Sequence, residues 1–456
     1  MSSSYAVHIQ RRHERVGRSL ERSIAWRLVV SLVLGLGYVI WPTDFFLVAM
    51  AIVTIVSSVH RPKKGQISLG IYIILSVQYV WCVVGCLIYA FNLEPVTVSY
   101  IRSVYFQDEN LRTAIFCSLQ LLFVMCALAA VKDADLVRNN KLTNLYRSIL
   151  MAGIVVASIA CNQSGTIFEG GYGQEGFNTS RWGGWPLIFV VLCSAFILLD
   201  RMRGAISVIF INVIVAYWLI HGNRSEVLIL FIFANMLFLM SRFGFNFSSP
   251  RNIILGGLVV FGAFIAFEFI GSVRSQGLSH GAAILSPGKM SQEGSIRIST
   301  IGSSVYSHVA AIGVMQNENY LLGLSYLYQL TNLIPSFVPV PWDRGEDVVS
   351  IVRDADVMGG IGVTGEAYVN FGIIGPPLFA ALMAMVFGRV AQASVESKWA
   401  ASFFVALVLY STRFFFYGYV YLFKTIMFFI FLFVMLRLLE QLGIVRPARA
   451  VSQGQR

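Results

Sequence analysis

Apolar residues in this chain come in long runs and not in the narrow stripes of amphipathic helices or strands. The runs are roughly 17 to 25 residues long, which is the length a helix needs to cross the hydrocarbon core of a bilayer. Because backbone polar groups in lipid must be satisfied within their own segment, we expect each run to be a helix. We predict about twelve spans, near residues 24–41, 44–60, 68–91, 112–131, 148–166, 184–199, 205–221, 226–241, 252–270, 363–387, 400–416 and 419–439.

Composition agrees with this pattern. Hydrophobic residues make up 57% of the 456 positions and charged residues 12%, whereas a soluble domain has roughly 25% charged residues. The first 25 residues predict a basic arm and not a cleavable signal peptide, because no small-residue cleavage site follows the first apolar run. The predicted fold class is an all-α polytopic membrane protein.

Lysine and arginine predict the orientation, since cytoplasmic loops of membrane proteins carry an excess of both. Most of the 34 basic residues fall inside if the N-terminus is cytoplasmic, and an even number of spans returns the C-terminus to the same side. The net charge of +11 then reflects orientation and contact with anionic lipid, and nucleic-acid binding is not expected. The predicted segments are a cytoplasmic arm (1–25), helices one to nine (26–270), a large outer loop (271–362), helices ten to twelve (363–440) and a cytoplasmic tail (441–456).

Cysteine and histidine form no metal or disulfide pattern. The six cysteines fall in or beside predicted spans without a CxxC pair, and the outer loop contains none of them. The six histidines show no metal-ligand spacing. We therefore expect no disulfide, no metal and no cofactor.

The outer loop at 271–362 is far longer than an ordinary connection, and loops of such length are usually functional or disordered. Aromatic residues are frequent in it, and the apolar stretches VYSHVAAIGVM and YLLGLSYLYQL predict short helices on the membrane surface. The first of these stretches contains His308. We therefore expect a functional loop.

The glycine-rich segment GGIGVTGEAYVNFGIIG follows at 359–375. A helix is predicted to begin near Thr364, with Glu366 and Asn370 at positions i and i+4 of one face. The free N–H groups of a helix start suit an anion. The structural alternative is that Thr364 caps the helix and that Glu366 is only a favourable acid of its first turn.

Arginine is the second recurring feature of the predicted outer face. Several guanidinium groups around one cavity would suit a lipid-linked pyrophosphate, because each binds phosphate through two hydrogen bonds and keeps its charge. The alternative for each is a surface arginine whose head group reaches the interface. The arginines concerned are Arg224, Arg274, Arg297 and Arg413. Two further charges, Glu268 and Lys424, lie inside apolar spans, where we expect structural partners.

Together these segments resemble the Wzy-type polysaccharide polymerases, which join lipid-linked O-antigen or related repeat units. GEAYVNFGIIG after a long outer loop is similar to the late segment of that family. The turn HGNRSE around Arg224 is similar to the family's Gly-Ser-Arg-Gly turn, with Gly-Asn-Arg-Ser here. The stretch from Arg297 to LLGLSY (321–326) is similar to the loop helix of polymerases and O-antigen ligases. The topological resemblance covers nearly the whole chain, and the motifs cover a small part of it.

The resemblance implies a glycosyltransferase fold of the C class, type B, with short helices in the long periplasmic loop. It implies a metal-independent, multi-pass enzyme of the bacterial inner membrane with both termini in the cytoplasm. That enzyme would transfer the growing glycan from undecaprenyl pyrophosphate to a sugar hydroxyl of a second undecaprenyl-pyrophosphate-linked repeat unit. A flippase and a Wzz-type chain-length regulator would act in the same pathway.

The resemblance also implies roles for particular residues. The family's histidine after the long loop is absent here, so Glu366, the acidic stretch at 343–356 or His308 must serve as the base. The residues expected to bind pyrophosphate or glycan are Arg224, Arg274, Arg297, Arg413, Tyr368 and Asn370.

Three other functions stay open: an O-antigen ligase, a secondary transporter, and a structural or scaffold membrane protein. An O-antigen ligase would share the fold, orientation and donor, and would transfer the glycan to lipid A-core; the missing histidine argues against it. A twelve-helix secondary transporter belongs to a different class. Transporters often contain repeats and bind substrate near the bilayer midplane, whereas this chain shows no repeat and its singled-out charges concentrate at the predicted outer face.

Overall fold

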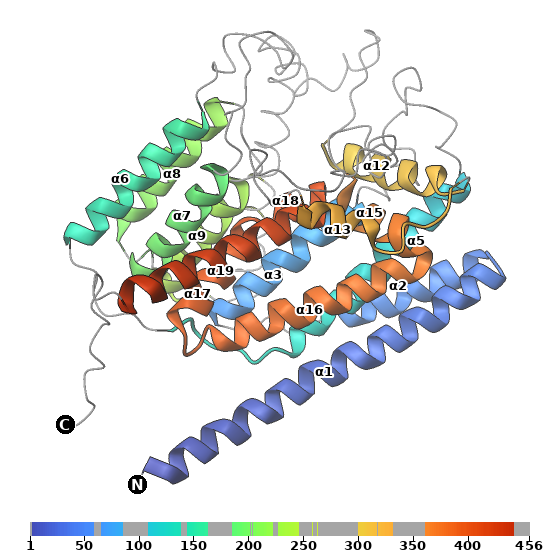
Figure 1. The fold of residues 1–456 in the computed structure, drawn as a ribbon, viewed down its shortest axis with the longest axis horizontal. Coiled ribbons are helices and arrows are strands. Elements are labelled where there is room, and N and C mark those ends of the chain that lie inside the picture. The colour runs from blue at the N-terminus through green and yellow to red at the C-terminus, as the bar shows by residue number, and fades with distance from the viewer. Residues whose placement is uncertain are drawn as a thin grey trace.

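The computed structural model describes residues 2–58, 65–84, 108–137, 144–162, 185–200, 202, 204–221, 227–245, 258, 262, 300–316, 318–331 and 361–441. Every regular element in these ranges is a helix, as the sequence predicts (Figure 1). Helices occupy eleven of the predicted span ranges, and the remaining one, 252–270, lies almost entirely outside the described residues.

Three stretches are long and apolar enough to cross a membrane by themselves: Arg18–Ile40, Asp108–Ala130 and Gly362–Ala393. The other apolar helices are shorter, so the number of spans stays a prediction.

The first half of the chain forms α1 (Ser2–Ile40), α2 (Asp44–Ser58), α3 (Gln66–Gln78) with the π-helix η1 (Tyr79–Val84), α5 (Asp108–Met125) with the 3-10 helix η4 (Cys126–Ala130), α6 (Asn144–Cys161), α7 (Trp185–Asp200), α8 (Ala205–Ile220) and α9 (Val227–Phe243). The second half forms α12 (Thr300–Val314), α13 (Leu324–Thr331), α15 (Gly362–Phe371), the 3-10 turn η5 (Gly372–Ile374), α16 (Gly375–Ala393), α17 (Lys398–Leu409), α18 (Ser411–Tyr417) and α19 (Tyr419–Gln441).

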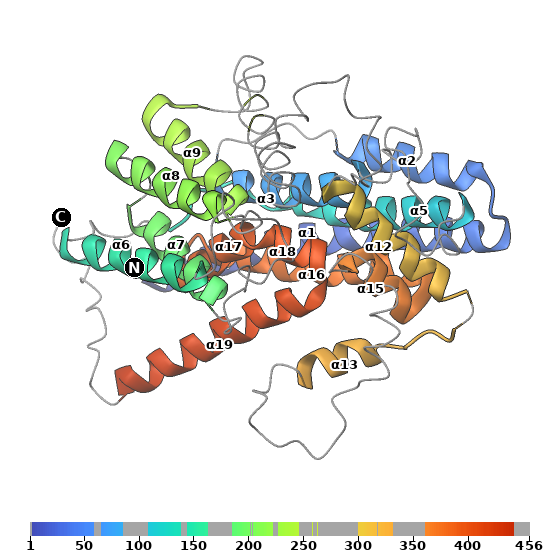
Figure 2. The same ribbon diagram turned by 90° about the horizontal axis from the view of Figure 1, so that it is seen from above.

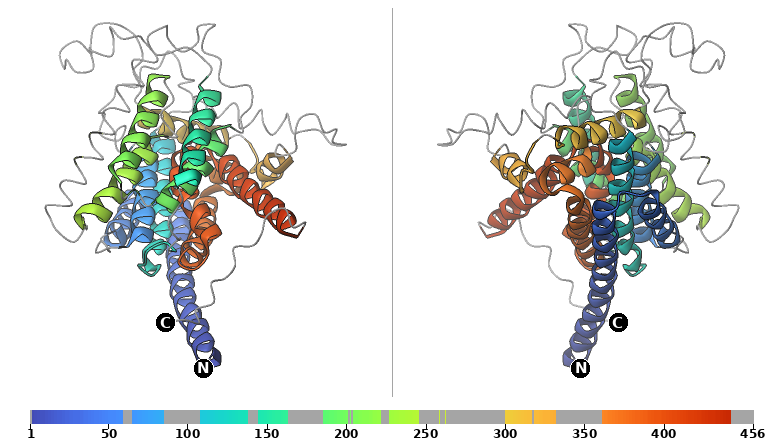
Figure 3. Two further views of the ribbon diagram at one scale, coloured as in Figure 1. Left: turned by 90° about the vertical axis from the view of Figure 1, so that its left-hand side faces the viewer. Right: turned by 90° about the vertical axis from the view of Figure 1, so that its right-hand side faces the viewer.

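Helix α5 is at the centre of the bundle. It packs against α1, α2, α12 and α16, and every residue from Ala114 to Met125 is buried. Helix α17 contacts α7 and α9 and so joins the centre to the group α6–α9, which lies at the left of Figure 1. Helix α19 leans away from the bundle and contacts α13 (Figures 2 and 3).

The outward sides of several helices are apolar. Val33 of α1 is 61% exposed, Phe45 of α2 is 69% exposed and Phe431 of α19 is 64% exposed. Water would not favour such continuous apolar surfaces, whereas lipid tails are as apolar as these side chains. The surface is that of a membrane-associated protein, as the composition indicates.

Distant segments meet at one end of the bundle. The Gly65 N–H donates to both carboxylate oxygens of Asp133, at 2.9 and 3.0 Å, and the Val137 N–H donates to the Ser394 carbonyl at 2.9 Å. All four residues belong to or adjoin loops that are predicted to be cytoplasmic and basic. We call this end, marked by Gly65, Asp133 and Ser394, the basic end.

Predicted outer segments meet at the opposite end. Arg112 and Asp44 form an ion pair at 3.3 Å, and the Gln316 amide donates to the Asn110 side chain at 2.7 Å. The helices of the predicted outer loop, α12 and α13, also lie here. We call this end the loop end. Predicted inner segments thus contact one another, and so do predicted outer segments, while the side that faces the cytoplasm stays a prediction.

The predicted span 363–387 is not one continuous helix. Helix α15 ends at Phe371, Gly372 has a φ of 59°, and α16 begins at Gly375, followed by Pro376 and Pro377. Glycine adopts this backbone conformation readily, and proline suits the first turn of a helix. A Cβ on Gly375 would collide with the Ala367 carbonyl. The break separates α15, a ten-residue helix at the loop end, from α16.

Candidate functional site

Helix α15 positions the candidate site. It packs against α12, α16, α18 and α5, at the right of the bundle in Figure 1. Glu366, Tyr368 and Asn370 lie on it, and His308 reaches it from α12. The helix begins at Gly362, with Ile361 as its N-cap. Thr364 is therefore inside the helix, and the expectation that it caps the helix is wrong.

Glu366 connects two helices. Its side chain is 1% exposed, and its Oε2 accepts the Tyr419 N–H at 2.7 Å. Tyr419 is the first residue of α19, so the carboxylate lies at the positive end of that helix. Gly418 precedes it with a φ of 102°, and a Cβ there would collide with Oε2. Glu366 therefore stabilises the start of a different helix from the one that carries it.

Asn370 fixes the loop segment on α15. Its Oδ1 accepts the Gly323 N–H at 3.1 Å, and its Nδ2 donates to the Ser325 hydroxyl at 2.6 Å and to the Glu366 carbonyl at 2.8 Å. An asparagine amide has two N–H donors, and both are used here. The interactions of Asn370 thus position residues 323–325 beside Glu366.

Backbone hydrogen bonds strengthen the same junction. The N–H groups of Leu321 and Leu322 donate to the carbonyls of Val369 and Asn370 at 3.1 and 2.9 Å. Leu322 has a φ of 48°, an uncommon conformation for a residue other than glycine. Such backbone persists where surrounding contacts impose it, and it is frequent at functional sites.

Aromatic rings surround this junction. The ring centroid of Tyr326 on α13 lies 4.4 Å from that of Phe379, 5.4 Å from that of Tyr419 and 6.4 Å from that of Phe423. Burial raises the pKa of Tyr326, and the charge of Glu366 raises it further. Tyr326 is therefore a neutral phenol in the immediate surroundings of the carboxylate.

His308 is fully buried, with 0% exposure, and within the described part of the chain neither ring nitrogen has a hydrogen-bond partner. A Cβ on Gly362, whose φ is 66°, would collide with Nε2, so glycine makes room for the ring. Burial lowers the pKa of His308 to about 4. The imidazole is therefore neutral at neutral pH and a weak base in this arrangement.

Tyr368 is half-buried beside Tyr320, with their ring centroids 6.0 Å apart in an edge-to-face arrangement. Tyr320 is 45% exposed. The Tyr320 ring also limits Gly372, where a Cβ would lie 2.8 Å from the Tyr320 Cζ. These two tyrosines are the accessible aromatic surface nearest to Glu366 along α15, and such surfaces suit the apolar faces of sugar rings.

Two cations lie over one ring at the start of α19. The Arg413 Cζ is 5.7 Å from the Tyr421 ring centroid, and the Lys424 Nζ is 5.4 Å from it. The sequence predicts a structural partner for Lys424, but Lys424 forms no ion pair with any residue that the structure describes, and Glu268 lies outside that part. Arg224, Arg274 and Arg297 also lie outside it, so only Arg413 among the predicted arginines is located.

The site is closed. Glu366, His308 and Asn370 are at most 1% exposed, so a substrate reaches them only when neighbouring segments separate.

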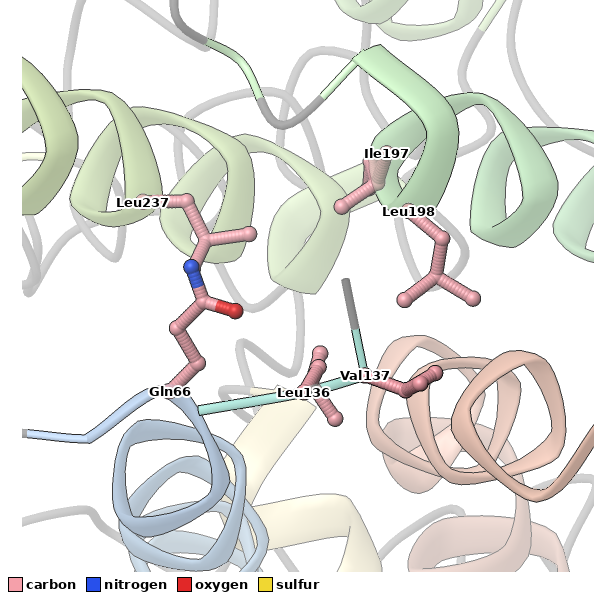
Figure 4. Close-up of a pocket in the computed structure, with 6 residues that line it drawn as sticks. All are labelled: Gln66, Leu136, Val137, Ile197, Leu198 and Leu237. Carbon is pink, nitrogen blue, oxygen red and sulfur yellow. The ribbon is translucent and has the colours of Figure 1, made fainter. Parts of the chain in front are cut away.

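The cavity in Figure 4 lies elsewhere, near the basic end, between α3, α7, α9 and the segment after η4. Its lining is mostly aliphatic, and we assign it to packing. Its lining residues are Gln66, Leu136, Val137, Ile197, Leu198 and Leu237. Within the described ranges, no group of three potential metal-binding side chains comes together.

Comparisons with protein families, characterised proteins and solved structures find no match to this chain. The function is therefore argued from the site and from the motif resemblance.

The sequence does not single out three residues of this site: Ser325, Tyr326 and Tyr419. The stretch LLGLSYLYQL predicts a helix, but its spacing does not show that Asn370 binds Ser325. For Tyr419 the only available signal is Gly418, a single glycine before a predicted span. Lys424 is singled out by its position in an apolar span, where the sequence predicts a structural partner.

Proposed function

We propose that this protein is a membrane glycosyltransferase that polymerises lipid-linked oligosaccharides. The growing glycan leaves its undecaprenyl pyrophosphate carrier and is transferred to a hydroxyl of a second lipid-linked repeat unit, at the periplasmic face of the bacterial inner membrane. The observation that carries the proposal is Glu366, a carboxylate buried to 1% exposure in the segment that resembles the polymerases.

Glu366 is the base in this proposal. An acceptor hydroxyl attacks the anomeric carbon, the bond from that carbon to the pyrophosphate oxygen breaks, and the carboxylate accepts the hydroxyl proton. Geometry is the first requirement for a general base, and the bond from the Tyr419 N–H fixes the orientation of this carboxylate. His308 supports the role less well, because burial lowers its pKa to about 4.

Arg413 and Lys424 bind the leaving group in this proposal. Pyrophosphate gains negative charge as the glycosidic bond breaks, and fixed cations stabilise such charge most in a partly dehydrated site. Both cations lie around Tyr421, which follows Tyr419 by two positions. Tyr421 lies in the first turn of α19, the helix whose first N–H donates to Glu366.

The closed site favours transfer over hydrolysis. A carboxylate and an imidazole at 1% and 0% exposure are shielded from bulk water, and excluding water prevents its competing attack on the donor. Opening must therefore accompany substrate entry, and the two lipid-linked substrates can approach through the membrane.

A deletion strain tests the proposal. Loss of a polymerase leaves single repeat units on the cell-surface lipid, and the wild-type gene restores long chains. Loss of a ligase leaves no repeat units there, with long chains retained on the carrier. Glycan of normal length in the deletion strain would contradict both functions.

A further inference from the structure

Gln78 is a buried side chain whose amide has no hydrogen-bond partner among the residues that the structure describes. It is 0% exposed, and neither its Nε2 nor its Oε1 is paired with any of them. Placing an amide in an apolar environment without hydrogen bonds is unfavourable in proteins. Each such group in a native structure calls for an explanation, and polar residues within apolar spans are usually functional.

Gln78 lies where α3 changes its helix type. Helix α3 starts at the basic end and ends at Gln78, and the π-helix η1 follows directly over Tyr79–Val84. π-helical turns occur frequently at functional sites. The π-helix packs against α5, α12 and α18, and α3 itself contacts α18, so the segment that begins directly after Gln78 lies beside the helices of His308 and Arg413. Figure 1 shows α3 running from the region of α17 toward α13 and α15.

Gln120 provides a comparison within the same bundle. It is also 0% exposed, and its Oε1 has no partner among the described residues either, but its Nε2 donates to the Ser31 carbonyl at 3.0 Å and so links α5 to α1. The role of Gln120 is therefore structural. Gln78 makes no such link, although it occupies an equally buried position.

We propose that Gln78 is a specificity-determining residue that hydrogen-bonds a sugar hydroxyl of the lipid-linked glycan. A carboxamide offers donors and an acceptor on one planar group, which suits adjacent hydroxyls of a sugar ring. It carries no charge, so it does not compete with Arg413 and Lys424 for pyrophosphate. The inference rests on the proposed function and adds that the site distinguishes a glycan-bearing lipid from the bare carrier.

Binding of two lipids to the purified full chain in nanodiscs tests the inference. One probe is undecaprenyl pyrophosphate, and the other is the lipid-linked repeat unit extracted from the deletion strain. Native mass spectrometry measures the ratio of their affinities. We expect the wild type to prefer the glycan-bearing lipid and Gln78→Leu to reduce this preference about tenfold, because two neutral hydrogen bonds are lost. Binding of undecaprenyl pyrophosphate should not change.

Gln120→Leu is the matched control, and it should keep the preference while lowering the thermal unfolding midpoint. Gln78→Leu should not lower that midpoint, since leucine removes an unpaired buried amide. Gln78→Met, with an unbranched side chain, replaces Gln78→Leu if the branched side chain prevents folding.

The outcomes separate the two claims. If the wild type prefers the glycan-bearing lipid and both Gln78 variants keep that preference, the role of Gln78 is contradicted and the proposed function stands. A fall in unfolding midpoint as large as that of Gln120→Leu would make Gln78 structural and would also overturn the inference. If the wild type binds neither lipid, the proposed function fails together with the inference.

Discussion

At each end of the bundle, a carboxylate accepts hydrogen bonds at the start of a helix. Asp133 accepts the Gly65 N–H at 2.9 and 3.0 Å and the Ser68 hydroxyl at 2.5 Å, at the start of α3. Glu366 accepts the Tyr419 N–H at 2.7 Å, at the start of α19. In both places a glycine that precedes the helix has no room for a Cβ beside the carboxylate.

The surroundings of the two carboxylates differ. Asp133 is partly exposed to solvent, whereas Glu366 is 1% exposed beside Tyr326 and Tyr419. Stabilisation of the start of α3 is enough to explain the position of the Asp133 carboxylate, because a partly hydrated carboxylate at a helix start is favourable. Glu366 differs from Asp133 in being buried, and burying a charge is strongly unfavourable unless other interactions compensate. Under the proposed function, Glu366 has a second role, proton transfer, that Asp133 does not have.

The largest expected difference between the two carboxylates is in activity. Glu366→Gln keeps an oxygen that can accept the Tyr419 N–H but removes the base, so chain growth should fall by about a hundredfold or more. Asp133→Asn should leave chain growth intact. Glycan length on gels, with both proteins at equal abundance in the membrane, measures the effect. Full activity of Glu366→Gln would remove the base assignment.

Replacing Gly418 or Gly65 by alanine should lower the stability of the protein by different amounts. Gly418→Ala introduces a Cβ at a φ of 102° and against the Glu366 carboxylate, and we expect a loss of about 3 kcal/mol of stability. Gly65 has a φ of −82°, so Gly65→Ala collides with Asp133 and with the Ala134 carbonyl but adds no left-handed backbone strain, and we expect it to destabilise less. Thermal unfolding of the purified proteins ranks them, and a smaller shift for Gly418→Ala would contradict the account.

Removing a cation should reduce chain growth at the loop end but not at the basic end. Arg413→Gln and Lys424→Gln remove cations from Tyr421 at the loop end, and each should reduce chain growth about tenfold through lost charge stabilisation. The control is Arg389→Gln, which breaks an exposed ion pair with Glu21 at 3.2 Å near the basic end. Exposed pairs contribute little, so the control should match the wild type. Equal activities in all three variants would exclude a pyrophosphate role for Arg413 and Lys424.

The loop end should also be sensitive to acid. The pKa of His308 is about 4 in the folded protein and near 6.5 in the unfolded chain. The unfolded chain therefore binds the proton first as the pH falls, and the stability that His308 contributes above pH 6.5 is lost between pH 6.5 and 4. The loss between pH 7.5 and 5 is about 2 kcal/mol. His308→Leu should flatten the thermal-stability profile over this range, and an unchanged slope would contradict the burial of a neutral imidazole.

The sequence predicts most helices because lipid requires long apolar segments with satisfied backbones. It does not predict the break at Gly372, since a single glycine in an apolar run is compatible with a continuous helix, whereas Gly418 falls between the predicted spans 400–416 and 419–439. The segment around Glu366 was recognisable from its motif, but the acceptance of the Tyr419 N–H was not. That bond joins residues 53 positions apart, and no local spacing encodes such a contact. Gln78 was overlooked because one glutamine in an apolar run has no pattern, and only the structure shows that its amide is unpaired.

Polymerisation by the purified protein tests the central claim most directly. The wild type in nanodiscs is incubated with the lipid-linked repeat unit from the deletion strain, and the lengths of the lipid-linked glycans are measured by mass spectrometry. The account predicts a ladder of products, each longer by one repeat unit, and none from Glu366→Gln at the same protein concentration. A wild-type protein that binds this lipid but forms no longer product, or a ladder that Glu366→Gln produces equally well, would contradict it.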